Sequence, residues 1–238
     1  MEGDAQKVSD TTTIVSQKES LRRVKINQMI TLFDVVYEEL LHENRLKEKG
    51  ERFANWRVPT EVANIVKQKL KLMEPDKLLG SIYGIQVGDT FRYRSQLQMI
   101  GLHCQPQVGI DYTKINGKNL AISIVDSHRY STESTSCDMM IYCGQGGLGF
   151  LGNKLPPEDQ KLARGNCALK NSLDEKNPVR VIRKVEGAGK NDVFVYYGLY
   201  TVDNYTQERS AEGKMVFKFQ LQRIPGQPQL HTMFNICR

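Results

Sequence analysis

The chain reads Val179-Arg180-Val181-Ile182-Arg183-Lys184-Val185 and then, after a short polar interval, Val193-Phe194-Val195-Tyr196-Tyr197-Gly198-Leu199-Tyr200-Thr201-Val202. Branched and aromatic side chains dominate both runs, and such residues favour β-strands. Three further runs have the same character: Leu120–Val125, Met139–Tyr142 and Met215–Leu221. The sequence therefore predicts a sheet that occupies most of the chain after about residue 80.

Apolar and polar side chains also alternate over residues 91–97, which predicts one more half-buried strand at the start of this region. A single helix is expected among the strands, over Glu158–Leu169, directly after Pro156-Pro157. Because only one helix separates so many strands, regular alternation of strands and helices is disfavoured. We predict a mostly antiparallel α+β domain with a barrel-like sheet.

The first part of the chain has helical periodicity instead. Ser16-Gln17-Lys18-Glu19 has the spacing of a capping box, and apolar residues then recur at helical spacing. A helix is therefore expected over about 17–47, and a second between Pro59-Thr60-Glu61 and Glu74-Pro75. We expect a disordered start over residues 1–16, an amphipathic two-helix segment over 17–77, a second domain over 78–230 and a tail over 231–238.

The composition is that of a folded, basic protein. Of 238 residues, 39% are hydrophobic and 25% are charged, which argues against disorder. The formal net charge is +6, and most of the excess lies in residues 79–238, with 19 basic and 14 acidic side chains. Such a balance favours anionic partners such as nucleic acid. No apolar run is long enough to span a bilayer and no secretory signal is visible, so the five cysteines are expected to be reduced.

Gly144-Gln145-Gly146-Gly147-Leu148-Gly149 matches the Gly-x-Gly-x-x-Gly pattern of dinucleotide-binding turns. That turn needs a helix directly after it to hold the pyrophosphate, whereas Pro156-Pro157 follow here. A dinucleotide-dependent enzyme is therefore the weaker interpretation, and a flexible loop the simpler one. The histidines and cysteines show no closely spaced ligand pairs, so neither a metal nor a cofactor is expected.

Two tyrosines, Tyr130 and Tyr142, flank a polar loop that contains Glu133. A base that leaves a duplex loses its stacking and must regain it on aromatic faces. Two tyrosine rings with a carboxylate between them could sandwich such a base and accept a hydrogen bond from its edge. The alternative is that both tyrosines pack in the core.

The order of several motifs resembles the SRA domain family (SET- and RING-associated, also called YDG). The resemblance covers about residues 79–230 and is greatest to the SRA domains of plant histone methyltransferases of the suppressor-of-variegation type. Residues 20–77 resemble the helical segment that precedes the domain in those proteins. The motifs are Ile85–Phe91, Ile100–His103, Gly109–Tyr112, Ile141–Gly147, Ala168–Ser172, Asn177–Arg183, Tyr196–Tyr200 and Phe217–Pro228.

The resemblance implies a twisted SRA-type β-barrel that binds double-stranded DNA and flips 5-methylcytosine into a pocket. By position, Tyr130 and Tyr142 correspond to the tyrosines that sandwich the flipped base. Thr132 and Glu133 stand where relatives carry the aspartate that reads the cytosine amino group. It also implies a nuclear, chromatin-linked protein, with chromatin proteins as further partners and no membrane.

Two loops and a set of basic residues complete the expected interface. Gln107 corresponds to the thumb-loop residue that fills the space left by the base, and Asn153-Lys154 resembles part of the finger loop. The basic excess also supplies candidate phosphate contacts, which are Lys154, Lys170, Arg180, Arg183 and Lys184.

Some positions depart from the family pattern. The Tyr-Asp-Gly motif is Tyr196-Tyr197-Gly198 here, and His128-Arg129 replaces a glycine pair. Two hypotheses follow. The first is a methylcytosine reader without enzymatic activity, because no pre-SET, SET, RING or PHD motif is visible in the sequence. The second is a diverged SRA fold that binds DNA or a protein partner without reading methylation.

Overall fold

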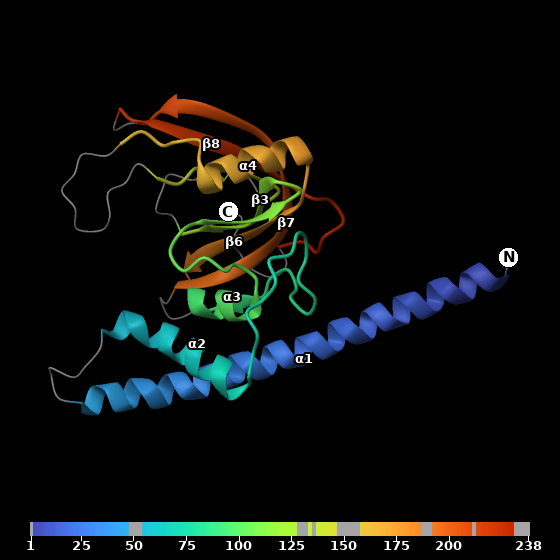
Figure 1. Cartoon of the computed structure of the whole chain (residues 1–238), viewed down its shortest axis with the longest axis vertical. Helices are drawn as coiled ribbons and strands as arrows, with labels where there is room; N and C mark the ends of the chain where they lie inside the picture. Colours follow the sequence, from blue (N-terminus) through green and yellow to red (C-terminus); the bar gives the residue numbers. More distant parts are fainter. Residues whose placement is uncertain are drawn as a thin grey trace. The chain divides into compact units, whose positions relative to one another are not determined.

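The computed structural model describes residues 2–47, 54–127, 133–134, 137–146, 158–186, 192–210 and 213–230. It divides into two compact units (Figure 1). The first comprises Met1–Pro75 with Ile82–Ile85, and the second comprises Asp76–Ser81 with Gln86–Arg238.

The first unit is helical. Its elements are α1 (Glu2–Leu46), the short 3-10 helix η1 (Asn55–Arg57) and α2 (Val58–Lys69). Buried apolar residues recur every three or four positions on both helices, and the two helices pack against each other. The buried residues are Ile26, Met29, Phe33 and Val36 on α1 and Val58, Val62, Ala63 and Val66 on α2.

Both helices have ends that differ from the expected ones. α1 begins at Glu2, so it extends through the segment expected to be disordered, and no proline interrupts its hydrogen-bond ladder. α2 ends at Lys69, where Lys71 takes a positive φ of 50° and the Leu72 amide bonds back to the Lys67 carbonyl at 2.9 Å. This left-handed turn closes the helix before Pro75. No described helix is both long and apolar enough to cross a membrane.

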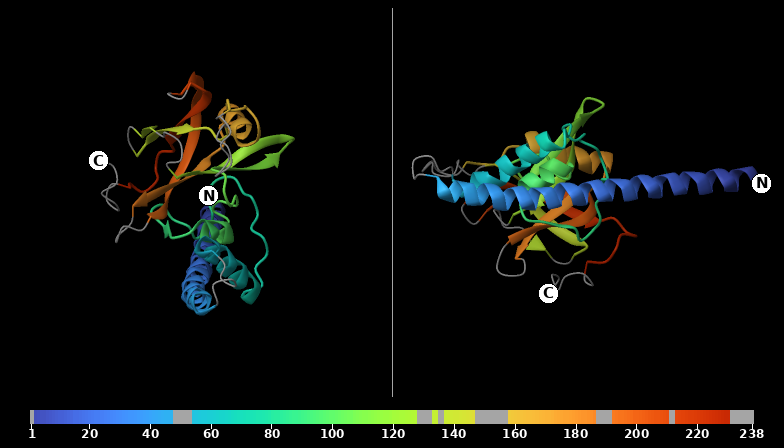
Figure 2. Two further views of the ribbon diagram at one scale, coloured as in Figure 1. Left: turned by 90° about the vertical axis from the view of Figure 1, so that its left-hand side faces the viewer. Right: turned by 90° about the horizontal axis from the view of Figure 1, so that it is seen from below.

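The second unit is built on one strongly twisted sheet (Figure 2). Seven strands follow the path β2-β3-β6-β7-β8-β5-β4, and β1 pairs with β7. All pairs are antiparallel except β3 with β6. The strands are β1 (Thr90–Phe91), β2 (Ile110–Ile115), β3 (Lys118–Asp126), β4 (Glu133–Ser134), β5 (Met139–Cys143), β6 (Val179–Glu186), β7 (Asp192–Arg209) and β8 (Met215–Arg223).

The predicted mostly antiparallel α+β architecture is confirmed. The five runs of branched and aromatic residues are β3, β5, β6, β7 and β8. The sheet is not closed, however: within the described strands its path ends at β2 on one side and at β4 on the other. It is therefore an open, twisted sheet rather than a complete barrel.

Helix α4 (Arg164–Glu175) covers part of the sheet and contacts β2, β3 and β7. Its own residues Ala168 and Leu169 are fully buried against the sheet, and its Ser172 hydroxyl accepts a hydrogen bond from the Ala121 amide at 2.9 Å. The same core contains Ile110, Ile124, Val181, Tyr200 and Phe219. α4 therefore fixes the sheet edge formed by β2 and β3, from which the candidate site is built.

The prediction of a strand over 91–97 is wrong, because the chain forms helix α3 (Arg94–Ile100) there. The Gln96 side-chain oxygen accepts hydrogen bonds from the backbone amides of Arg92 at 2.8 Å and Tyr93 at 3.1 Å. These bonds satisfy amides at the helix N-terminus that have no partner inside the helix. Capping by Gln96 therefore outweighs the strand-like alternation.

The helix expected over Glu158–Leu169 begins instead at Arg164. The Asp159 carboxylate accepts a hydrogen bond from the Met215 amide at 2.8 Å, and the Gln160 side-chain oxygen accepts one from the Phe217 amide at 2.9 Å. These contacts bind residues 159 and 160 to β8, so the helix starts only after them.

The cysteines are not all reduced. Cys104, Cys143 and Cys167 are free thiols, as expected, but Cys137 is disulfide-bonded. Pairing depends on how close two cysteines lie in space, which their sequence spacing does not reveal.

Candidate nucleic-acid interface

The structure describes only some of the predicted site residues. Tyr142, Gln107, Lys170, Arg180, Arg183 and Lys184 lie within the described ranges, and Glu133 is placed by its backbone in β4. The remaining candidates lie outside the described residues: Tyr130, Thr132, Asn153 and Lys154.

Tyr142 lies on β5 and only 4% of it is exposed. Its hydroxyl approaches the backbone of Gly109 so closely that a Cβ at position 109 would lie 2.3 Å from the hydroxyl oxygen. On the sheet, Glu133 pairs with Ile141, the residue before Tyr142. The backbone register therefore puts Glu133 on the strand beside Tyr142, at a position that shares a face of the sheet with Ile141 rather than with Tyr142.

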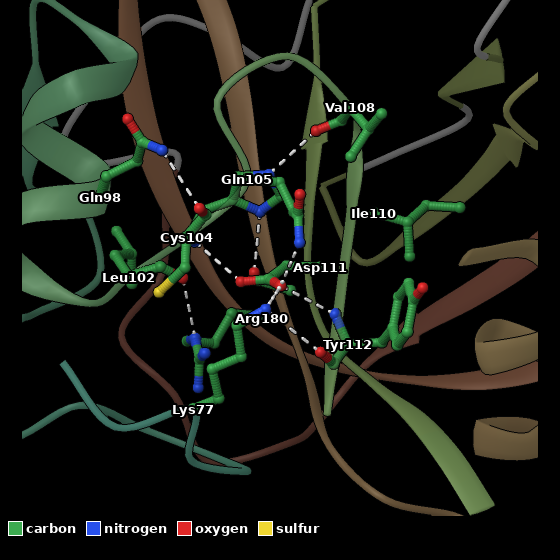
Figure 3. A network of polar contacts seen from close by, with 12 residues as sticks. Lys77, Gln98, Leu102, Cys104, Gln105, Val108, Ile110, Asp111, Tyr112 and Arg180 are labelled. Carbon is green, nitrogen blue, oxygen red and sulfur yellow. Dashed lines mark hydrogen bonds and ion pairs between the residues drawn. The ribbon is translucent and has the colours of Figure 1, made fainter. Parts of the chain in front are cut away.

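Gly109 directly follows the loop Cys104–Val108, which we call the thumb loop because it contains Gln107. Side chains bind the backbone carbonyls in and beside this loop at every second residue. Arg180 Nε donates to the Leu102 carbonyl at 3.1 Å and Gln98 Nε2 to the Cys104 carbonyl at 3.1 Å (Figure 3). One Arg94 amino group donates to the carbonyls of Pro106 at 3.3 Å and Val108 at 3.1 Å. The loop is thus tied to α3 and β6.

Asp111 binds the start of the thumb loop from the other side. It is fully buried, and one of its oxygens accepts a hydrogen bond from the Cys104 amide at 2.8 Å (Figure 3). The other oxygen accepts from Lys77 Nζ at 2.6 Å, from the Tyr112 amide at 2.9 Å and from the Gln105 side chain at 3.4 Å. Burial alone would raise the pKa of Asp111, but the bonds from Lys77 and Cys104 outweigh it and lower that pKa. Asp111 is therefore a charged anchor.

His103 is a neutral anchor at the same place. It is fully buried, with Nδ1 2.8 Å from the Ser123 hydroxyl oxygen and Nε2 3.1 Å from the Val108 carbonyl oxygen. Because a carbonyl can only accept, Nε2 carries the proton and Nδ1 accepts from Ser123. Burial, with a contribution from the charge of Arg94, lowers the pKa of His103 to about 3. The ring therefore stays neutral at physiological pH.

Gln107 lies exposed within this anchored loop, next to Val108, which is 42% exposed. Across the described part of the chain, no hydrogen bond to the Gln107 side chain is found. The loop therefore presents a free glutamine from a fixed backbone. This arrangement suits a group that must enter a duplex without first ordering its own loop.

The glycine stretch is held just as firmly where it is described. Asn166 accepts a hydrogen bond from the Gln145 amide and donates to the Gln145 carbonyl, both at 2.9 Å. The Gln145 side-chain oxygen accepts from the Ile110 amide at 3.3 Å. Ile110 follows Gly109, so the first residues of β2 connect the thumb loop, Tyr142 and the glycine stretch.

This arrangement does not form a dinucleotide turn within the described residues, because the helix that follows the glycines begins only at Arg164. No three His, Cys, Asp or Glu side chains come together to hold a metal ion in those parts of the chain.

The prediction that Arg180 contacts phosphate is wrong. It is fully buried, and besides Leu102 its guanidinium donates to the carbonyls of Leu78 at 2.8 Å and Gly80 at 2.7 Å. The first four residues of β6 are all buried, so alternation along this strand does not turn Arg180 toward solvent.

The other basic candidates within the described residues are ion-paired. Lys170 lies 2.6 Å from Asp174, and Lys184 pairs with Asp192. Arg183 lies 3.3 Å from Asp126 and stands over the Tyr197 ring at 5.3 Å from its centroid. A phosphate would have to replace these carboxylates, which Lys170 and Lys184 permit because their side chains are 36% and 34% exposed.

Sequence reasoning missed the residues that hold the site. They make hydrogen bonds within and around the thumb loop, the start of β2 and the glycine stretch: Lys77, Arg94, Gln98, His103, Asp111, Gln145 and Asn166. The available signal was that His103, Asp111 and Gln145 stand in the motifs Ile100–His103, Gly109–Tyr112 and Ile141–Gly147.

The comparisons with known proteins agree with one another. A family model described as the SAD/SRA domain matches residues 78–227. The histone-lysine N-methyltransferase SUVH5 of Arabidopsis thaliana is 42% identical over 87% of this chain, and a YDG domain-containing protein of that plant is 38% identical over 86%. These matches cover 27% and 63% of the relatives' own lengths, so the chain corresponds to only part of each.

Among solved structures, the SRA domain of SUVH5 in complex with fully methylated CG DNA is similar to this chain. Its TM-score is 0.57 with 47% sequence identity, and the match covers 64% of this chain and 99% of that one.

Proposed function

Since this chain belongs to the SAD/SRA domain family, we propose that it is a DNA-binding module that reads 5-methylcytosine by flipping the base out of the duplex. The SUVH5 SRA complex with methylated CG DNA supports this proposal by similarity. The observation in this chain that carries it is the contact of Tyr142 with Gly109, at the base of an anchored thumb loop with Gln107 exposed.

A protein that flips a base must offset the free energy that flipping costs. Extruding a base costs a few kcal/mol of stacking and pairing, which a reader must offset on both sides of the vacated site. Tyr142 offers a ring for the extruded base, and each stacked aromatic contributes about 1–3 kcal/mol. Gln107 offers a polar group to fill the gap in the duplex. Tyr130, Thr132 and Glu133 complete the proposed pocket, and Asn153 and Lys154 the proposed finger loop.

Electrostatic attraction supplies the part of the affinity that is independent of sequence. The excess of basic over acidic residues in 79–238 favours a polyanion. Lys170, Arg183 and Lys184 remain the proposed phosphate contacts.

The test is a binding titration of one short duplex with a central CG site, either methylated or unmethylated, at one fixed salt concentration. We expect tighter binding to the methylated duplex. Gln107→Ala should weaken that binding without lowering the melting temperature. The matched control is Gln207→Ala, which removes an exposed glutamine of β7. Equal affinity of the wild-type chain for both duplexes would refute the proposal that it reads methylation.

One observation favours a second candidate function, binding of DNA or a protein without reading methylation. Tyr142 belongs to the hydrophobic core and is only 4% exposed, as a packing residue would be. In that case Tyr142→Ala would lower the melting temperature by several degrees and leave no methylation preference to lose. If Tyr142 is instead a pocket residue, Tyr142→Ala should lower the affinity for the methylated duplex more than it lowers the stability of the fold.

We further propose that the chain acts as a binding module without catalysis and works in the nucleus, together with chromatin proteins. The similarity to SUVH5 supports this placement. A fluorescent fusion of the chain should accumulate in plant nuclei, and exclusion from them would contradict it.

A further inference from the structure

We propose that the Lys77–Asp111 ion pair fixes the thumb loop in its DNA-binding conformation before DNA arrives, so that both residues are positioning residues for base reading. The proposal rests on the proposed function and names residues that would not themselves touch DNA. Lys77 lies in the segment Asp76–Ser81, well before the thumb loop in the sequence.

The geometry of Asp111 carries the inference. Its side chain is fully buried, and its four hydrogen bonds come from both sides of the thumb-loop entrance (Figure 3). Two of the donors, the Cys104 amide and the Gln105 side chain, belong to the first two residues of the loop. The Tyr112 amide fixes the carboxylate relative to β2. Asp111 therefore determines the direction in which the loop leaves His103.

Lys77 is the charge that allows this carboxylate to remain buried. It lies 2.6 Å from Asp111, and its side chain is 34% exposed. It also donates to the Tyr112 carbonyl at 3.4 Å. A buried carboxylate that loses its partner is costly, so removal of Lys77 would favour opening of the bonds between Asp111 and the loop.

A second cation ties the same segment to the loop entrance. Arg180 binds the carbonyls of Leu78, Gly80 and Leu102 at once. The segment that carries Lys77 is therefore held by Arg180 while Lys77 holds Asp111. The result is a rigid path from residues 77–80 to the loop that carries Gln107.

A preformed loop matters because ordering a loop on binding lowers affinity. Each immobilised side chain or loop element costs an amount equivalent to about three- to tenfold in affinity. The Lys77–Asp111 ion pair, which we call the clamp, removes that cost for Gln107. Its effect should therefore appear only where Gln107 is used, which is in binding to the flipped-base site.

The test is a double-mutant cycle with Lys77→Met and Gln107→Ala, measured as affinity for a methylated CG duplex. We expect Lys77→Met to weaken binding about three- to tenfold in the wild-type background and to have little effect in the Gln107→Ala background. The matched control is Lys67→Met, which removes the same charge from a partly exposed lysine paired with Glu74 at 2.8 Å in the helical unit. An equal loss of affinity in both backgrounds, or in the control, would overturn the proposal.

Amide hydrogen exchange supplies a readout that does not depend on DNA. In the free protein, Lys77→Met should speed exchange at the Cys104 amide and across the thumb loop, while the β7 and β8 amides keep their protection. Asp111→Asn is a second variant with the same expected pattern. Unchanged exchange at Cys104 in Lys77→Met would refute the clamp.

The two measurements also separate this inference from the proposed function. If the wild-type chain shows no preference for methylated DNA, the proposal that it reads methylation is refuted. The exchange result alone then decides whether the clamp exists. If the preference is present but the cycle is additive, the reader stands and the positioning role of Lys77 is refuted.

Discussion

The backbone of Gly109 and the hydroxyl of Tyr142 are in such close contact that any side chain at position 109 would overlap the hydroxyl oxygen, since a Cβ there would lie 2.3 Å away. Gly109 also accepts a hydrogen bond from the Val125 amide at 2.7 Å, so its backbone cannot easily withdraw. The end of the thumb loop and the candidate base-stacking ring are therefore mechanically linked.

This link predicts that Gly109→Ala displaces the Tyr142 ring or the loop. We expect a loss of about 1–3 kcal/mol in the free energy of unfolding, which is typical of overpacking, together with weaker binding of methylated DNA. Tyr142→Phe removes the overlapping hydroxyl, so Gly109→Ala should cost less in that background. Chemical denaturation of the four variants of this cycle checks the coupling, and strictly additive effects would show that the close contact has no consequence.

The neutral His103 predicts a pH dependence of stability. Burial lowers its folded-state pKa from 6.5 to about 3, so between these values the unfolded state binds one more proton than the folded state. The stability from this group is complete above pH 6.5 and is lost as pH falls toward 3, by at most about 1.4 kcal/mol per pH unit. His103→Gln should flatten the curve of unfolding free energy between pH 6.5 and 4.5. An unchanged slope would mean that His103 titrates normally in the folded protein.

Arg180 and Lys184 should behave in opposite ways although both were expected to contact phosphate. Arg180→Met removes the donor to three backbone carbonyls, of which that of Leu102 is buried and those of Leu78 and Gly80 are partly buried, so we expect the free energy of unfolding to fall by about 3 kcal/mol with no change in the salt dependence of DNA binding. Lys184→Met removes a surface pair, which should change stability by less than about 1 kcal/mol. If Lys184 does contact phosphate, the slope of log affinity against log salt should fall by about 1. A change of that slope in Arg180→Met would contradict its assignment as a structural residue.

The pairing of Asn166 with Gln145 predicts that Asn166→Ala loosens the glycine stretch. The substitution removes two hydrogen bonds to Gln145 and one to the Lys161 carbonyl, from a residue that is only 1% exposed. We expect a loss of about 1–3 kcal/mol in the free energy of unfolding and faster amide exchange at Gln145. The comparison variant Asn171→Ala, on the same helix as Asn166, removes the bond to the Asn119 carbonyl and the contact with Cys167 Sγ, and should spare the Gln145 amide.

The sequence was sufficient for β3, β5, β6, β7 and β8 because these strands are rich in branched and aromatic residues, but it did not predict β2 or β4. β6 and β7 follow the two runs quoted first, within one residue at most ends. It was not sufficient for α3, because one side chain, Gln96, reverses the preference of the whole segment. It also failed at Arg180, since a strand buried on both faces gives no sign of which residues meet solvent.

The candidate site likewise contains some residues that the sequence could indicate and others that it could not. The proposed pocket and loop residues were predicted from the resemblance, by their position relative to motifs of fixed order, and the proposed phosphate contacts were predicted from the basic excess. The residues that hold those motifs are contributed by distant segments: Lys77, Cys104 and Gln105 meet at Asp111 only in the folded chain. Hydrogen bonds between a side chain and distant backbone leave no local pattern in a sequence, so this network required the structure.

The central claim is that the chain extrudes a methylated cytosine from the duplex, and the most direct measurement is of base unstacking. A 2-aminopurine placed next to the methylcytosine of a CG duplex fluoresces more strongly when its neighbour leaves the stack. We predict that fluorescence rises when the wild-type chain binds the methylated duplex, and that the rise is much smaller with the unmethylated duplex or with Tyr142→Ala. Binding of the methylated duplex with no rise, or equal rises with both duplexes, would contradict the account.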